Sequence, residues 1–168
     1  AATFRLSADQ GGISVTGAVN ASGVTGGSIH LSANGSVTLG SGALLTVAAQ
    51  DFNSAGKGGD ITLEAGATRN GVAGTGAVDI QTGSTLNLSV ASKVAGGETT
   101  AGSSAYQGRF SGTLHIRAPQ NSTFNDLLVN PLNGAIIGAS SILVEGFRVY
   151  DLTASGGVIS AATQTSIR

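Results

Sequence analysis

Charged and aromatic residues suited to recognition gather in the stretch 91–112, ASKVAGGETTAGSSAYQGRFSG. The residues that stand out among its small neighbours are Lys93, Glu98, Tyr106 and Arg109. Tyr and Arg are enriched at recognition surfaces, and loops on a rigid scaffold often carry binding residues. We therefore treat these four residues as a candidate binding site for a glycan or a protein. The alternative is a solvated excursion in which Tyr106 or Phe110 covers the edge of a core.

A second group of charged residues occupies equivalent positions in a repeated motif, apolar-x-apolar-x-small. Glu64, Arg117 and Glu145 each follow the second apolar residue of one copy. If the copies stack in register, Arg117 lies between the two carboxylates, one strand away from each. Exposed ion pairs contribute only ~0–1 kcal/mol each, but a slip in register would lose both. We interpret the three residues as a structural ladder that fixes register.

The residue patterns of common enzymes are missing. There is no Gly-x-Ser-x-Gly nucleophile elbow, and the Asp residues are scattered, whereas glycosidases need two carboxylates at a defined separation. His30 and His115 fall two strands apart, too far to share a metal ion. The Gly-rich stretch 66–76 is followed by no helix that could help to cradle a phosphate. We predict no catalytic residue, no metal site and no cofactor.

The motif that carries the ladder recurs as a short alternating strand. Alternation of apolar and polar residues predicts strands, and separators such as Gly40-Ser41-Gly42 predict tight corners. The copies cover residues 4–8, 29–33, 61–65, 114–118 and 142–146. Their inward residues predict two apolar ladders, one running from Phe4 to Ile142 and the other from Leu6 to Val144.

Two further strands follow each copy, which gives about five rungs of three short strands. The second strands are expected at 13–15, 37–39, 78–80, 127–129 and 147–149, and the third at 19–21, 45–47, 86–88, 135–137 and 158–159. Equivalent strands would stack in parallel ~4.8 Å apart, and each rung would close its core only against its neighbours. This pattern predicts an all-β fold, a parallel β-helix or solenoid, with corner insertions at 48–59, 66–76 and 91–112. We expect no capping helix at either terminus.

Composition narrows the classes of function. A net charge of −1 lacks the basic footprint of a nucleic-acid binder, so we expect no nucleic-acid partner. No apolar run approaches the ~20 residues that span a bilayer, so we expect no membrane insertion. The chain has 168 residues, no Cys and no Met, and begins Ala1-Ala2. We therefore expect residues 1–168 to be a single β-helix segment of a longer chain.

The repeats resemble those of one protein family. GGSIHLSANGSVTLGSGALLTV, GGDITLEAGA with GAVDIQTGSTLNLSV, and SSILVEGFRVYDL are similar to repeats of the filamentous haemagglutinin-type exoproteins of Gram-negative bacteria. The resemblance implies a right-handed parallel β-helix, export through an outer-membrane partner (two-partner secretion), and an adhesin or a stalk at the cell surface or outside the cell. It carries no catalytic residue to this chain.

Three functions follow from these observations. The first is a non-catalytic shaft or binding segment of a secreted filamentous adhesin, whose loops contact a glycan or a host or bacterial surface protein. The second is a structural subunit or segment that stacks end to end into an extracellular filament through unpaired strand edges. The third, a β-helix enzyme acting on polysaccharides, is disfavoured because no acidic cluster is visible.

Overall fold

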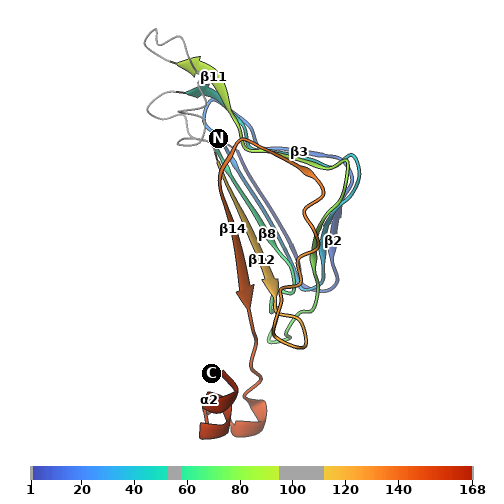
Figure 1. The fold of residues 1–168 in the computed structure, drawn as a ribbon, viewed down its shortest axis with the longest axis vertical. Coiled ribbons are helices and arrows are strands. Elements are labelled where there is room, and N and C mark those ends of the chain that lie inside the picture. The colour runs from blue at the N-terminus through green and yellow to red at the C-terminus, as the bar shows by residue number, and fades with distance from the viewer. Residues whose placement is uncertain (1, 53–57, 95–111, 168) are drawn as a thin grey trace.

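The computed structural model describes residues 2–52, 58–94 and 112–167, which fold mainly into parallel β-strands (Figure 1). Among these residues, sheet A contains β1 Thr3–Ala8, β4 Ser28–Ala33, β8 Asp60–Glu64, β12 Gly112–Pro119 and β14 Ala139–Phe147. Sheet B contains β2 Ile13–Val15, β5 Val37–Leu39 and β9 Val78–Ile80. Sheet C contains β3 Ala18–Asn20, β6 Leu44–Thr46, β10 Thr85–Asn87 and β13 Ala135–Ile137.

The chain visits the three sheets in a fixed order. It runs through β1, β2 and β3, then β4, β5 and β6, then β8, β9 and β10, and we call one such passage a pass. Figure 1 looks along the direction in which the passes stack, and the sheets lie along three sides of a triangle. In each strand apolar and polar residues alternate, so the apolar side chains lie on one face of the sheet. This apolar face lines the inside of the triangle.

The register of sheet A confirms the two predicted apolar ladders. The first joins Phe4, Ile29, Ile61, Leu114 and Ile142, and the second joins Leu6, Leu31, Leu63, Ile116 and Val144. Every pairing in this sheet is parallel. The five motif copies in the sequence are therefore five neighbouring strands of one sheet.

Burial is complete in the middle of the stack and lost at its two ends. The middle members of both ladders, from Ile29 to Ile116, are 0% exposed. At the first strand Phe4 is 38% and Leu6 43% exposed, and at the last strand Ile142 is 48% and Val144 42% exposed. Each pass is therefore covered only by its neighbours, and the outer passes have an apolar face with no cover among the described residues.

The glycines before the strands of sheet A are explained by close backbone contacts. A Cβ built on Gly59 would lie 2.0 Å from the carbonyl oxygen of Gly27, and one on Gly112 would lie 1.9 Å from that of Gly59. No side chain fits at such distances. The repeated Gly at this corner therefore lets successive passes lie at strand spacing.

The second strands match the prediction through the third pass and the third strands through the fourth, where β13 pairs with β10, and both sets then diverge. Residues 127–129 form no strand: Val129 makes an isolated parallel bridge with Val78 of β9, and Leu127 makes an isolated antiparallel bridge with Gln120. Residues 148–149 and 158–159, predicted as the last second and third strands, are not strands, and Val158 is 62% exposed. The prediction of a complete fifth rung is therefore wrong for the described chain, in which the fifth pass consists of β14 alone.

The C-terminal segment folds by local interactions instead. Asp151 Oδ1 accepts hydrogen bonds from the backbone N–H and hydroxyl of Thr153, at 2.8 and 2.5 Å, before the 3₁₀ helix η1 Thr153–Ser155. Ser160 Oγ accepts the Thr163 N–H at 3.2 Å, as an N-cap does, before the α-helix α2 Ala161–Ile167. The sequence pattern predicted no capping helix at this terminus and did not predict α2. In Figure 1 both helices lie beyond one corner of the triangle, away from the end of the stack.

Two of the predicted insertions begin as strands. β7 Ala49–Phe52 and β11 Val90–Val94 pair in parallel, so the ranges 48–59 and 91–112 are not loops throughout. The insertion 66–76 is a corner that contains a tight turn at Asn70-Gly71, with φ of 49° and 77°. Positive φ at both central residues is the type I′ geometry that Asn-Gly favours.

Candidate functional site

A row of charged side chains crosses the outer face of sheet A near the C-terminal ends of its strands. The register places Ser32 beside Glu64, Glu64 beside Arg117, and Arg117 beside Glu145. These residues alternate with the buried ladder positions, so their side chains face outward. The sheet therefore brings together the three residues of the predicted structural ladder.

Arg117 bonds both neighbouring carboxylates. Its Nη1 donates to Glu64 Oε1 at 2.5 Å, and its Nε donates to Glu145 Oε1 at 3.3 Å. Glu145 also contacts His115, because its Oε2 lies 3.0 Å from His115 Nε2. One guanidinium thus ties three successive strands of sheet A together.

The row continues through a residue that sequence reasoning did not single out. The hydroxyl of Ser32 donates to Glu64 and accepts from a terminal nitrogen of Arg69, and Arg69 Nε lies 3.7 Å from Asp9 Oδ1. Arg69 directly precedes the Asn70-Gly71 turn, which is closed by hydrogen bonds between Arg69 and Val72 at 2.8 and 2.9 Å. The Asn-Gly pair was the signal in the sequence that could have located this turn.

The electrostatics of the row favour its charged forms. Burial opposes ionisation of Glu64, but hydrogen bonds from Ser32 and Arg117 outweigh it and hold the pKa of Glu64 below its ordinary value. Burial likewise opposes the charge of Arg117, and the hydrogen bonds and charges of Glu64 and Glu145 outweigh it and raise the pKa of Arg117. Burial and the nearby Arg5 lower the pKa of His30. A carboxylate with a lowered pKa is suited to hydrogen bonding and poorly suited to donate a proton near neutral pH.

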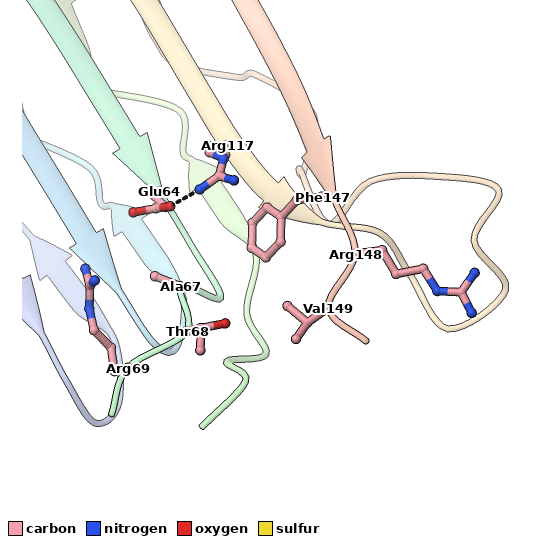
Figure 2. Close-up of a pocket in the computed structure, with 8 residues that line it drawn as sticks. All are labelled: Glu64, Ala67, Thr68, Arg69, Arg117, Phe147, Arg148 and Val149. Atoms are coloured by element: carbon pink, nitrogen blue, oxygen red, sulfur yellow. Dashed lines mark hydrogen bonds and ion pairs between the residues drawn. The ribbon is translucent and has the colours of Figure 1, made fainter. Parts of the chain in front are cut away.

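A pocket of about 420 Å³ lies over this row (Figure 2). Its floor includes Glu64 and Arg117 from β8 and β12. One wall comes from the 66–76 corner and the other from the end of β14 and the residues after it. The lining consists of Glu64, Ala67, Thr68, Arg69, Arg117, Phe147, Arg148 and Val149.

Aromatic rings hold two of the guanidinium groups. The Arg117 guanidinium lies over the Phe147 ring, 4.7 Å from its centroid. That of Arg148 lies 3.4 Å from the centroid of Phe124 and 4.5 Å from that of Tyr150. Figure 2 shows the Arg148 side chain directed away from the other labelled residues. Arg148 therefore borders the pocket without turning its charge into it.

The candidate binding residues of the long insertion are not brought to this pocket by any described contact. Lys93 lies in β11, where it pairs with Asp51 of β7. Glu98, Tyr106 and Arg109 lie outside the described residues. Their role as a binding site remains a prediction.

The described part of the chain contains neither a metal-binding cluster nor a membrane-spanning helix. No group of three or more His, Asp or Glu side chains there could hold a metal ion. No helix there is long and apolar enough to cross a membrane.

Comparisons of this chain with protein-family models, with curated proteins and with solved structures found no match.

Proposed function

We propose that this chain is a stretch of right-handed parallel β-helix that serves as a non-catalytic shaft or binding segment of a secreted, filamentous adhesin. Each pass is a rung of the helix, and the corner insertions provide surface that can meet a glycan or a protein. The handedness, the extracellular location, the Gram-negative origin and the outer-membrane secretion partner all rest on the resemblance of the repeats to haemagglutinin-type exoproteins.

The observation that carries the proposal is the open apolar face at each end of the stack. Phe4 and Leu6 occupy the same ladders as Ile142 and Val144, yet all four are exposed while every member between them is buried. A further pass with the same register would cover either end. The architecture thus supports a segment of a longer rod more than a self-contained domain.

A second candidate is a subunit that stacks end to end with separate copies of itself. The same ends favour it, because β1 and β14 are edge strands of sheet A whose outer backbone groups can pair with another strand. An enzyme acting on polysaccharides has less support, because Glu64 and Glu145 are both bonded to Arg117. That arrangement differs from the unequal pair of acid and base that glycosidases use.

Cell binding tests the adhesin proposal. The purified chain is expected to bind cultured cells and to compete with adherence of the bacterium that produces it. A variant with residues 95–111 replaced by a short Gly-Ser corner keeps β11 intact and tests the predicted loop residues Glu98, Tyr106 and Arg109. Loss of binding in this variant would assign recognition to the loop. Binding by neither chain would contradict a binding segment and leave the shaft.

Sedimentation separates the shaft from the self-stacking subunit. A self-stacking chain is expected to gain mass with concentration, and Leu6→Lys or Val144→Lys is expected to abolish the gain by placing a charge on one end. Exposed Val24→Lys at a corner is the matched control. A monomer at all concentrations would contradict the stacking subunit.

A further inference from the structure

We propose that the pocket over the charged row of sheet A binds an uncharged saccharide. The inference rests on the proposed adhesin function and gives it a ligand class and a second site, distinct from the 91–112 insertion. The pocket volume of about 420 Å³ falls within the roughly 300–1,000 Å³ of small-ligand sites. The pocket is open to solvent between the 66–76 corner and the end of β14, so an outer sugar of a longer glycan can enter it.

The charges of the pocket are balanced, which disfavours an anionic ligand. Arg117 is bonded by Glu64 and Glu145, and Arg69 Nε lies 3.7 Å from Asp9 Oδ1 without a hydrogen bond among the described residues. The Arg148 guanidinium rests on two aromatic rings and points away from the pocket. An acidic sugar would have to displace an existing carboxylate or enter without a cation of its own, and an unpaired buried charge is costly.

The same balance suits hydroxyl groups, which donate and accept at once. Among the described contacts, Arg117 uses Nε and Nη1, so the N–H groups of Nη2 are left to donate. Each Glu64 oxygen accepts one bond, from Arg117 or from Ser32, and has a second lone pair. The Thr68 hydroxyl lies at the rim. Guanidinium and carboxylate forks side by side can therefore bond neighbouring hydroxyls of one sugar ring.

A small apolar area, within a lining that is mostly polar, completes the match. Phe147 lines the pocket between its floor and the exposed Val149, which is 45% exposed. A pyranose ring has C–H groups on its faces, and these can pack on an aromatic ring or a valine side chain while the hydroxyls reach the floor. A fully polar ligand such as free phosphate would leave the side chains of Phe147 and Val149 exposed to water.

The test is binding to an array of immobilised polysaccharides that includes the uncharged dextran, mannan and galactan and the acidic polygalacturonate and heparin. The wild-type chain is expected to bind at least one uncharged polymer, with a Kd of about 1 mM or tighter per site. The affinity is expected to change little with salt, because no net charge is neutralised. Phe147→Leu is expected to weaken binding severalfold by removing the ring.

Filling the pocket locates the site. Thr68→Trp introduces bulk at an exposed rim position and is expected to weaken binding at least about tenfold. Val24→Trp adds the same bulk at an exposed corner outside the lining and is expected to bind as wild type. Val149→Trp replaces Thr68→Trp if circular dichroism shows that the latter does not fold.

Three results would overturn the proposal. They are no binding to any uncharged polymer, tight salt-sensitive binding to the acidic polymers alone, and binding that Thr68→Trp and Val149→Trp leave unchanged. Adherence to cells is measured with the same variants. If the variant with the filled pocket still adheres, the saccharide site is rejected and the adhesin function is kept. If the wild-type chain does not adhere at all, the binding segment itself is rejected and only the shaft is left.

Discussion

The middle and the ends of the stack carry the same sequence pattern with different physical outcomes. Leu63 and Leu6 occupy one ladder, in equivalent positions of β8 and β1, yet Leu63 is 0% and Leu6 43% exposed. The difference comes from neighbours alone, because β8 lies between two strands and β1 has one. In a repeat fold, the local sequence thus decides whether a side chain points inward or outward. Whether an inward side chain is buried depends on the adjacent passes.

Truncating the two leucines measures this difference directly. Leu63→Ala is expected to lower the free energy of unfolding by ~2–5 kcal/mol, because it removes buried atoms and leaves a cavity. Leu6→Ala is expected to cost less than ~1 kcal/mol, because much of its side chain is already in water. Urea unfolding followed by circular dichroism gives both values. Equal costs would show that the end of the stack is covered in solution.

Adding a methyl group at the corner tests the contact between passes. Gly59→Ala is expected to cost ~1–3 kcal/mol, since its Cβ would meet the Gly27 backbone and the strands would have to separate. Gly17→Ala is the matched control, because nothing lies within 4 Å of its Cβ and its φ is not positive. The measurement is the midpoint of thermal unfolding for the two variants. A Gly59→Ala chain as stable as Gly17→Ala would contradict the close approach at this corner.

The features that the sequence could predict are those that repeat from strand to strand in sheet A. The ladders from Phe4 to Ile142 were predictable because period-two alternation sets the face of each residue, and the stack only repeats it. The pairing of Arg117 with its two carboxylates followed from the same register. Both features depend on a local pattern that recurs in the same register from one strand of sheet A to the next.

What the sequence did not predict depends on competition between local and stacked structure. The last pass has a stacking partner on one side only, and there the turn at Asp151 and the cap at Ser160 give helices in place of two strands. Arg69 was missed because it reaches the charged row from a corner, and strand periodicity says nothing of corners. The pocket was missed for the same reason, since its walls come from the 66–76 corner and from the end of β14 with the residues after it, which are distant in sequence.

Substitutions in the charged row are expected to change stability less than substitutions in the core. They test the ion pairs that fix the register of sheet A without altering its buried face. Arg117→Met is expected to cost about 1 kcal/mol, because it removes two partly exposed ion pairs but keeps much of the side-chain packing on Phe147. Glu145→Gln is expected to cost less, because it leaves the Glu64 pair in place. Salt titration of the unfolding midpoint checks the origin of the effect. A cost for Arg117→Met that does not shrink in high salt would assign it to packing.

The smallest expected effect is the acid dependence of Glu64. Its pKa is lower in the folded chain than its ordinary value of 4.5, so folding favours the ionised form. The stability that this carboxylate contributes is present above about pH 4.5 and is lost as the pH falls through its folded pKa. The wild-type chain is therefore expected to lose more stability than Glu64→Gln between pH 5 and pH 3, by less than ~1 kcal/mol because the pair is partly exposed. Unfolding curves at these pH values decide it, and parallel losses in both chains would mean that other carboxylates at the ends of the stack set the acid limit.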